Sequence, residues 1–157
     1  MEDRKKEGRY GRIYKQLEEL CKRSSDPLAH MATICAVLHY KMDDYFWTGF
    51  YLLKEVDNKE ILVVGPYQGP VACQELPGPG GVCWAAIKNA GAVVVEDVHK
   101  FPGHVACDSR SSSEITLPVY DQDGRIRAVF DVDSDKTATF NQVDAKHLEE
   151  IMKLVFR

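Results

Sequence analysis

Residues 113–134 read SEITLPVYDQDGRIRAVFDVDS, and two apolar runs lie on either side of the Asp-Gly pair within this stretch. The runs Glu114–Tyr120 and Arg125–Val132 are rich in β-branched and aromatic residues, which favour strands. Asp-Gly between two such runs is a strong signal for a tight hairpin turn. We therefore expect two adjacent antiparallel strands joined at Asp121–Gly124.

More strands are expected upstream of this hairpin. Residues 45–53 (YFWTGFYLL) and 59–68 (KEILVVGPYQ) are strand-like and lie on either side of a charged turn at Glu55–Asn58, which predicts a second hairpin. A short strand is expected at Ala92–Val95, followed by a polar loop over Asp97–Ser113.

Helices are expected at both ends of the chain and once in the middle. Apolar residues recur at helical spacing before Cys21 and again over Leu28–Leu38, where Asp26 can cap the helix and Pro27 suits its first turn. On this pattern the thiols of Cys21 and Cys35 lie on buried faces.

The remaining predicted segments are an irregular Gly/Pro-rich stretch at Leu76–Gly81, a short helix at Val82–Asn89, and a closing helix at Gln142–Phe156 capped by Asn141. Helical ends around a strand-rich middle indicate an α+β fold with a mainly antiparallel sheet. A length of 157 residues fits a single domain, residues 1–157.

Composition narrows the classes of function. A net charge of −4 gives no basic footprint for nucleic acid, and no apolar run approaches the ~18 residues of a membrane span. We therefore expect no nucleic-acid partner, no membrane association and a cytoplasmic location. Thiols stay reduced there, so the five cysteines are not expected to form a structural disulfide framework.

Three cysteines, Cys73, Cys83 and Cys107, fall in or beside loop-like segments, where a reactive thiol has access to substrate. Cys107 has His104 and Arg110 close in sequence, and positive charge favours the nucleophilic thiolate. Three accessible thiols in a reducing compartment fit a cycle of attack, sulfenate formation and disulfide closure. The competing interpretation is that these are buried or incidental thiols.

Other chemistries have weaker support. A zinc site would need ligands from Cys73, Cys83, Cys107, His99 and His104. Structural zinc sites usually contain a CxxC or HxxxH pair, and none is present. The glycines of Gly78–Gly81 do not make a phosphate loop, because no Gly-Lys-Ser/Thr follows. Acyl transfer by Cys107 is supported only by a nearby histidine.

An ordered set of short segments carries a family resemblance. The segments are Trp47-Thr-Gly-Phe-Tyr51, Gly65-Pro-Tyr-Gln-Gly69, Val71-Ala-Cys73, Gly81-Val-Cys83, Glu96-Asp-Val-His99, Phe101-Pro-Gly-His-Val-Ala-Cys-Asp108, Ser113-Glu-Ile115 and Asp131-Val-Asp-Ser134. Together they closely resemble the free methionine-(R)-sulfoxide reductases, which are built on a GAF domain. The likeness runs from about Tyr45 to the end of the chain. In two places the sequence departs from the family pattern: Trp84 replaces a small residue, and Gln74-Glu75 replaces a basic one.

The resemblance implies a GAF-like sheet of about six mainly antiparallel strands flanked by helices. It implies that Cys107 is the catalytic thiol, that Cys73 is the main resolving cysteine and that Cys83 is an alternate or relay. Electrons would come from a thioredoxin-like reductant, with no flavin, nicotinamide or metal. It leaves room for a homodimer. The alternative is a non-catalytic GAF module that binds a small molecule.

An aromatic pocket is predicted on the strand at residues 45–53. Trp47, Gly49 and Tyr51 share one face of a strand because side chains alternate. The glycine would leave a hollow between the two aromatic rings, suited to the methyl and thioether of a methionine. The alternative is an aromatic face that only packs the core.

Three acidic residues complete the predicted site. Asp131 and Asp133 share one face of their strand, and the ammonium group of a free amino acid would compensate their burial. Glu114 is the predicted proton donor to the leaving oxygen, because burial or nearby carboxylates can raise its pKa. The alternatives are a solvated strand end for the aspartates and a surface position for Glu114.

Overall fold

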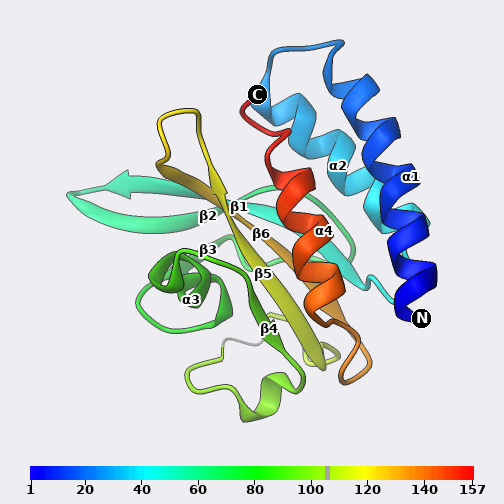
Figure 1. Cartoon of the computed structure of the whole chain (residues 1–157). Helices are drawn as coiled ribbons and strands as arrows, with labels where there is room; N and C mark the ends of the chain where they lie inside the picture. Colours follow the sequence, from blue (N-terminus) through cyan, green and yellow to red (C-terminus); the bar gives the residue numbers. More distant parts are fainter. Residues whose placement is uncertain (105–106) are drawn as a thin grey trace.

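The computed structural model describes residues 1–104 and 107–157, and its centre is a six-stranded antiparallel sheet in the order β3-β2-β1-β6-β5-β4 (Figure 1). The elements are α1 (Asp3–Cys21), α2 (Pro27–Lys41), β1 (Trp47–Val56), β2 (Lys59–Gln68), β3 (Glu75–Pro77), α3 (Val82–Asn89), β4 (Val93–Val95), the 3-10 helix η1 (Val98–Lys100), β5 (Ser113–Tyr120), β6 (Ile126–Ser134) and α4 (Gln142–Met152). The predicted α+β class and strand number are confirmed.

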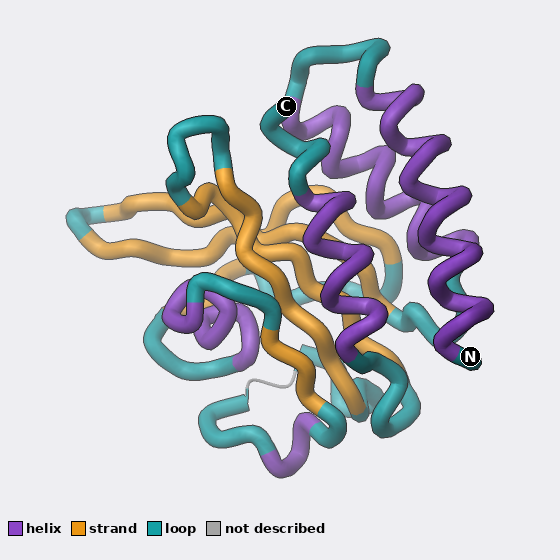
Figure 2. Tube along the Cα trace, in the orientation of Figure 1, coloured by secondary structure: helices purple, strands orange, loops and turns teal. Residues whose placement is uncertain are grey.

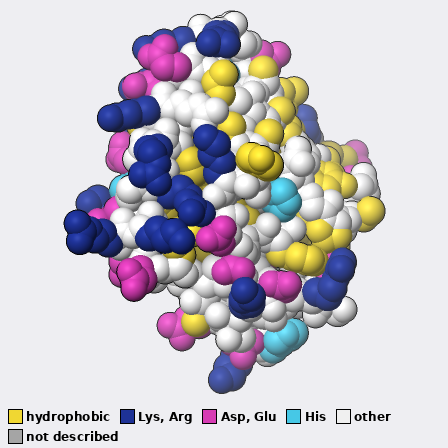
Figure 3. Space-filling model, turned by 90° about the vertical axis from the view of Figure 1, so that its right-hand side faces the viewer, with side chains coloured by type: hydrophobic (Ala, Val, Ile, Leu, Met, Phe, Trp, Pro, Cys, Tyr) yellow, Lys and Arg dark blue, Asp and Glu magenta, His cyan; other side chains and the backbone are white. Residues whose placement is uncertain are grey.

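The helices divide between the two faces of the sheet. Helices α1, α2 and α4 cover one face, whereas α3 and the long loops lie over the other (Figures 1 and 2). The main core fills the helical side, with Leu17, Ile34, Phe130 and Leu148 all fully buried. The outer surface of the helical layer carries basic and acidic side chains intermixed (Figure 3).

The hairpin of β5 and β6 forms as predicted. The Asp121 carboxylate accepts N–H bonds from Asp123 and Arg125, which closes the turn before β6 begins. The register places Glu114 opposite Asp133, and β1 on the other side of β6 places Gly49 opposite Asp131. Acidic and aromatic residues therefore meet at the centre of the sheet.

The predicted helix caps are also confirmed. The Asp26 side chain accepts a hydrogen bond from the Leu28 N–H at the start of α2. At α4, Asn141 accepts from the Val143 N–H, and Asp144 completes a capping box by accepting from the Asn141 N–H. Both helices thus begin where the sequence placed them.

Four local predictions need correction. Cys21, at the end of α1, was predicted on a buried face but is only partly buried. Part of the stretch predicted as irregular pairs with β2 as β3, where Pro77 is tolerated because the strand is at the sheet edge. Helix α4 ends at Met152, and the chain continues in tight turns that still bury Val155. The loop that follows β4 contains η1.

Among the described residues, no helix combines the length and the apolar character needed to cross a bilayer.

Candidate active site

A cavity lies between the centre of the sheet and α3, on the face opposite the main helical layer. Its floor comes from β1, β5 and β6, and its walls come from the start of α3 and the two loops that carry Cys73 and Cys107. It measures about 50 Å³, which is room for a few water molecules. Seven of the eight residues predicted for the site line this cavity: Trp47, Tyr51, Cys83, Cys107, Glu114, Asp131 and Asp133. The eighth, Cys73, is bonded to Cys107.

Cys73 and Cys107 form a disulfide whose Cα atoms are 5.4 Å apart. Cys107 is exposed and Cys73 is half-buried, so the bond lies at the mouth of the cavity within reach of solvent. Cys83 is a free, buried thiol on the first turn of α3. The three predicted redox cysteines thus fall into a bonded pair and a separate internal thiol.

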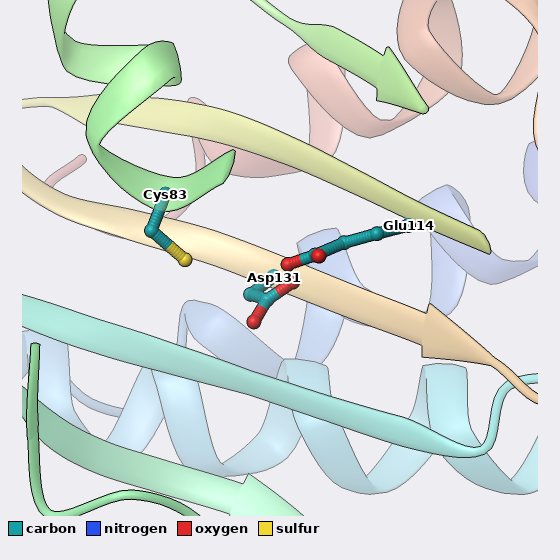
Figure 4. A group of neighbouring side chains, drawn as sticks. All are labelled: Cys83, Glu114 and Asp131. Atoms are coloured by element: carbon teal, nitrogen blue, oxygen red, sulfur yellow. The ribbon is translucent and has the colours of Figure 1, made fainter. Parts of the chain in front are cut away.

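Glu114, Asp131 and Cys83 form a compact cluster in the cavity that Cys107 also lines. One carboxylate oxygen from each acid and the Cys83 Sγ all lie within 4.8 Å of one another. Figure 4 shows the Cys83 thiol and the Glu114 carboxyl group pointing toward Asp131 from opposite sides. The position of Cys83 depends on α3, whose first turn is held to β5 by a hydrogen bond from Thr116 Oγ1 to the Val82 carbonyl, 3.0 Å long.

The acids of the site hold protons more tightly than ordinary carboxylic acids. Burial is the largest cause for each, and it raises the pKa of Glu114, Asp131 and Asp133. Each also feels a neighbouring carboxylate: Asp133 raises the pKa of Glu114, Glu114 that of Asp131, and Asp131 that of Asp133. Burial likewise raises the pKa of the Cys83 thiol. Burial in the cluster therefore favours the protonated form of each of these groups.

His104 is the basic group nearest to these acids in the described structure. Its Nε2 lies 3.7 Å from Glu114 Oε1, and burial lowers the pKa of the imidazole. His104 was singled out as a neighbour of Cys107, but its contact is with the proton donor predicted for the site. Arg110, the other predicted activator, has its guanidinium paired with Asp108 at 2.7 Å and placed over the Phe46 ring.

The aromatic wall differs from its prediction in one respect. Trp47 stacks between Tyr51 and Tyr67, with ring centroids 5.6 and 5.2 Å away. A Cβ at Gly49 would lie 2.5 Å from Trp47 Cη2, so the indole itself covers the glycine and no hollow remains between Trp47 and Tyr51. The glycine is needed for that close approach. The two rings border the cavity as a wall.

Two buried side-chain atoms in the described part of the chain have no hydrogen-bond partner, and both belong to residues that line this cavity. They are Trp47 Nε1, a donor, and Asp131 Oδ1, an acceptor. Unpartnered buried polar atoms cost roughly 1–3 kcal/mol each. A ligand carrying both an acceptor and a cationic donor would satisfy them together, and a free amino acid is such a ligand.

One residue that the sequence did not assign to the site, Trp84, helps to shape it. Trp84 donates from Nε1 to the Leu76 carbonyl at 2.9 Å, and its ring lies against Gly78. It thereby ties α3 to the Gly/Pro-rich loop. The sequence shows that Trp84 follows Cys83. It does not show the hydrogen bond to Leu76, because the conformation of the Gly/Pro-rich segment cannot be predicted from hydrophobic periodicity.

The sequence matches the GAF domain family over residues 24–155. It is 43% identical over 150 residues to GAF domain-containing protein A of Dictyostelium discoideum, covering 96% of this chain and 92% of that protein. It is 36% identical over 143 residues to the free methionine-R-sulfoxide reductase of Escherichia coli, covering 91% of this chain and 84% of that protein.

Solved structures give the same result. The free methionine-R-sulfoxide reductase of Neisseria meningitidis, determined in complex with its substrate, superposes with a TM-score of 0.89 at 39% identity, over 96% of this chain and 87% of that one. Sequence, fold and a cysteine-bearing cavity agree: the chain belongs to the GAF-domain family of free methionine-R-sulfoxide reductases, which are oxidoreductases.

Proposed function

We propose that this protein reduces free methionine-(R)-sulfoxide to methionine, with residues 1–157 acting as one catalytic domain. The observation that carries the proposal is the pair of unpartnered buried atoms, Trp47 Nε1 and Asp131 Oδ1, beside a redox-capable cysteine pair. The names of the relatives support the substrate and its R configuration.

Substrate recognition follows from the polarity of the cavity walls. The ammonium group of the substrate pairs with Asp131 and Asp133, which removes the cost of their burial. The methyl and thioether part packs against Trp47 and Tyr51, since sulfur interacts well with aromatic rings. Peptide-bound methionine sulfoxide has no free ammonium, so it would leave the aspartates unpaired.

The chemical step begins with the reduced enzyme. The Cys107 thiolate attacks the sulfoxide sulfur, and Glu114 gives its proton to the sulfoxide oxygen. The S–O bond breaks, methionine leaves, and the oxygen remains on Cys107 as a sulfenic acid. The substrate sulfur is reduced by two electrons and Cys107 is oxidised by two. The raised pKa of Glu114 suits it to this donor role.

The second half of the cycle restores the thiols. The Cys73 thiol attacks the Cys107 sulfenic acid, a disulfide forms, and water leaves. The adjacency of these two residues supports Cys73 as the resolving cysteine, and Cys83 remains the alternate. An external thioredoxin-like dithiol then reduces the bond and becomes a disulfide itself. A reducing compartment such as the cytoplasm supplies that dithiol.

The test is a single turnover by the fully reduced protein without added reductant. Methionine sulfoxide should convert to one methionine per chain, with the loss of two titratable thiols. Cys107→Ser should release no methionine, because a serine hydroxyl is scarcely ionised at neutral pH. Release of one methionine per chain by Cys107→Ser would show that Cys107 is not the attacking nucleophile.

Variants of Cys73 and Cys83 distinguish the step that forms the disulfide from the attack on the sulfoxide. Cys73→Ser should still release one methionine but should cycle slowly with thioredoxin. If the Cys73/Cys83 double variant cycles at the original rate, internal resolution is wrong. If the parent protein binds methionine sulfoxide and loses no thiols, the chain is a non-catalytic GAF binding module.

A further inference from the structure

We propose that Cys83, Glu114 and Asp131 form a binding site for one thiophilic divalent cation, such as Zn²⁺. The site goes beyond the proposed reductase function and does not depend on it. The disulfide between Cys73 and Cys107 leaves Cys83 outside the bonded pair, and its thiol points into the acidic cluster (Figure 4). The cation is not a cofactor of the reaction. It competes with substrate.

The geometry is close to that of a three-ligand metal site. The Cys83 Sγ, one oxygen of Glu114 and one oxygen of Asp131 lie within 4.8 Å of one another. Zn²⁺ binds sulfur at about 2.3 Å and carboxylate oxygen at about 2.1 Å, which holds its ligand atoms roughly 3.5 Å apart. Binding would draw the three ligand atoms closer together through rotation of their side chains. The cavity beside them has room for a water molecule as fourth ligand.

An independent observation also indicates a cation. Asp131 Oδ1 is buried and has no partner, in a residue that is only 5% exposed. Among the described residues, the basic side chain that lies within ion-pair distance of this cluster is His104, and burial favours its neutral form. The acids therefore have no matching positive charge on the protein. A metal ion supplies one directly.

The ligand types select the kind of metal. A thiolate with two carboxylates suits a borderline or soft ion such as Zn²⁺, Co²⁺ or Cd²⁺, whereas Mg²⁺ and Ca²⁺ prefer oxygen alone. Metal ligands must be deprotonated, so binding releases protons and strengthens as pH rises. Asp133, His104 and Tyr51 face the same cluster.

Occupation of this site has two consequences for the enzyme. The cation fills the position that the substrate ammonium would take beside Asp131. It also holds Cys83 as a bound thiolate, so that this thiol cannot act as an alternate resolving cysteine. Zn²⁺ is therefore expected to inhibit reduction by competing with methionine sulfoxide.

The test uses Co²⁺ and the protein with its Cys73–Cys107 disulfide closed. In that form the free thiols are Cys21, Cys35 and Cys83. Co²⁺ should produce a sulfur-to-cobalt charge-transfer absorption in the near ultraviolet that saturates at one equivalent. One equivalent of Zn²⁺ should remove it. No substrate or reductant is present, so the result is independent of whether the protein is a reductase.

Matched variants assign the absorption to this cluster. Cys83→Ser should abolish it, and Asp131→Asn should weaken Co²⁺ binding at least tenfold. Cys21→Ser, which changes a partly buried thiol on α1, should leave it unchanged. An absence of absorption in the parent protein would overturn the proposal, and so would its persistence in Cys83→Ser or its loss in Cys21→Ser. Near-ultraviolet circular dichroism checks that each variant is folded.

Discussion

Two buried aspartates lie on opposite faces of the sheet, and their surroundings differ sharply. Asp144, on the helical face, is 1% exposed, and both of its carboxylate oxygens have partners. Oδ2 accepts from Lys6 Nζ at 2.6 Å and from the Asn141 N–H at 2.9 Å, and Oδ1 accepts from the Tyr10 hydroxyl at 2.6 Å. This carboxylate joins α1 to the start of α4.

Asp131, on the other face, is 5% exposed but has an unpartnered Oδ1. Its near neighbours are Glu114 and Cys83, which carry negative charge if they ionise. The two aspartates are buried to a similar degree, so burial alone does not separate a structural acid from a functional one. The hydrogen bonds and ion pair of Asp144 are those of a structural residue, whereas the unpartnered Oδ1 of Asp131 supports our proposal that Asp131 binds a ligand.

The largest expected effect is a loss of substrate binding when Asp131 and Asp133 are replaced. The Asp131→Asn/Asp133→Asn double variant should lower kcat/KM for free methionine-(R)-sulfoxide by roughly 150- to 5,000-fold, because losing one partner of a buried charge pair costs about 3–5 kcal/mol. Steady-state kinetics with a thioredoxin system measures it. The N-acetyl R epimer, which lacks the ammonium, should be poor with both proteins. Equal kcat/KM values for the free and N-acetylated substrates would contradict this role.

The second effect is a loss of stability on the helical face of the sheet, with no change in catalysis. Lys6→Met removes the cation from Asp144 and should lower the free energy of unfolding by about 3 kcal/mol. For a chain of this size that corresponds to a fall in Tm of roughly 6–12 °C. Thermal unfolding checks the stability, and kcat at 25 °C should be unchanged. Lys22→Met, at an exposed ion pair with Glu19, is the matched control and should change Tm little.

The third effect is on the pH dependence of the chemical step. Glu114 has a raised pKa, through burial first and Asp133 second, and only its protonated form can give a proton to the sulfoxide. The single-turnover rate should therefore fall as pH rises through this raised pKa. Glu114→Gln should be slow at every pH and should lack that decline. If the variant keeps the same decline, another group donates the proton.

The strands that carry the site were predictable because their signals are local. The Asp-Gly turn and the alternation of polar and apolar residues fixed the β5–β6 hairpin, and with it the shared face of Asp131 and Asp133. The predicted hollow at Gly49 was wrong because alternation gives the face of Trp47 but not its rotamer, and the indole turns back over the glycine.

Contacts between residues far apart in the sequence could not be predicted. Lys6 and Asp144 are 138 positions apart, and no spacing rule links them. The pairing of Cys73 with Cys107 was suggested by the family resemblance, since spacing alone allowed Cys83 equally well. The catalytic and binding roles of the eight site residues stay predictions for the variants described above.

The smallest expected effect is on stability as a function of pH, and it separates the two aspartates without any substrate. In the folded protein the pKa of Asp131 lies above its ordinary value near 3.8, because of burial first and Glu114 second. A carboxyl group whose pKa is raised by folding adds stability that is fully present below the unfolded pKa and is lost as pH rises through the folded pKa.

Asparagine at position 131 cannot ionise, so the Asp131→Asn variant escapes that loss. It should gain stability relative to the parent protein as pH rises from about 4 to about 8. Removing the Asp131 carboxylate also relieves the repulsion that raises the pKa of Asp133, Tyr51 and Cys83 in the parent protein. Urea unfolding at both pH values measures the difference. Asp144→Asn should instead lose stability at neutral pH, because Lys6 then has no carboxylate to meet. If both variants lose stability equally at neutral pH, Asp131 is a structural acid like Asp144, and the contrast between the two faces fails.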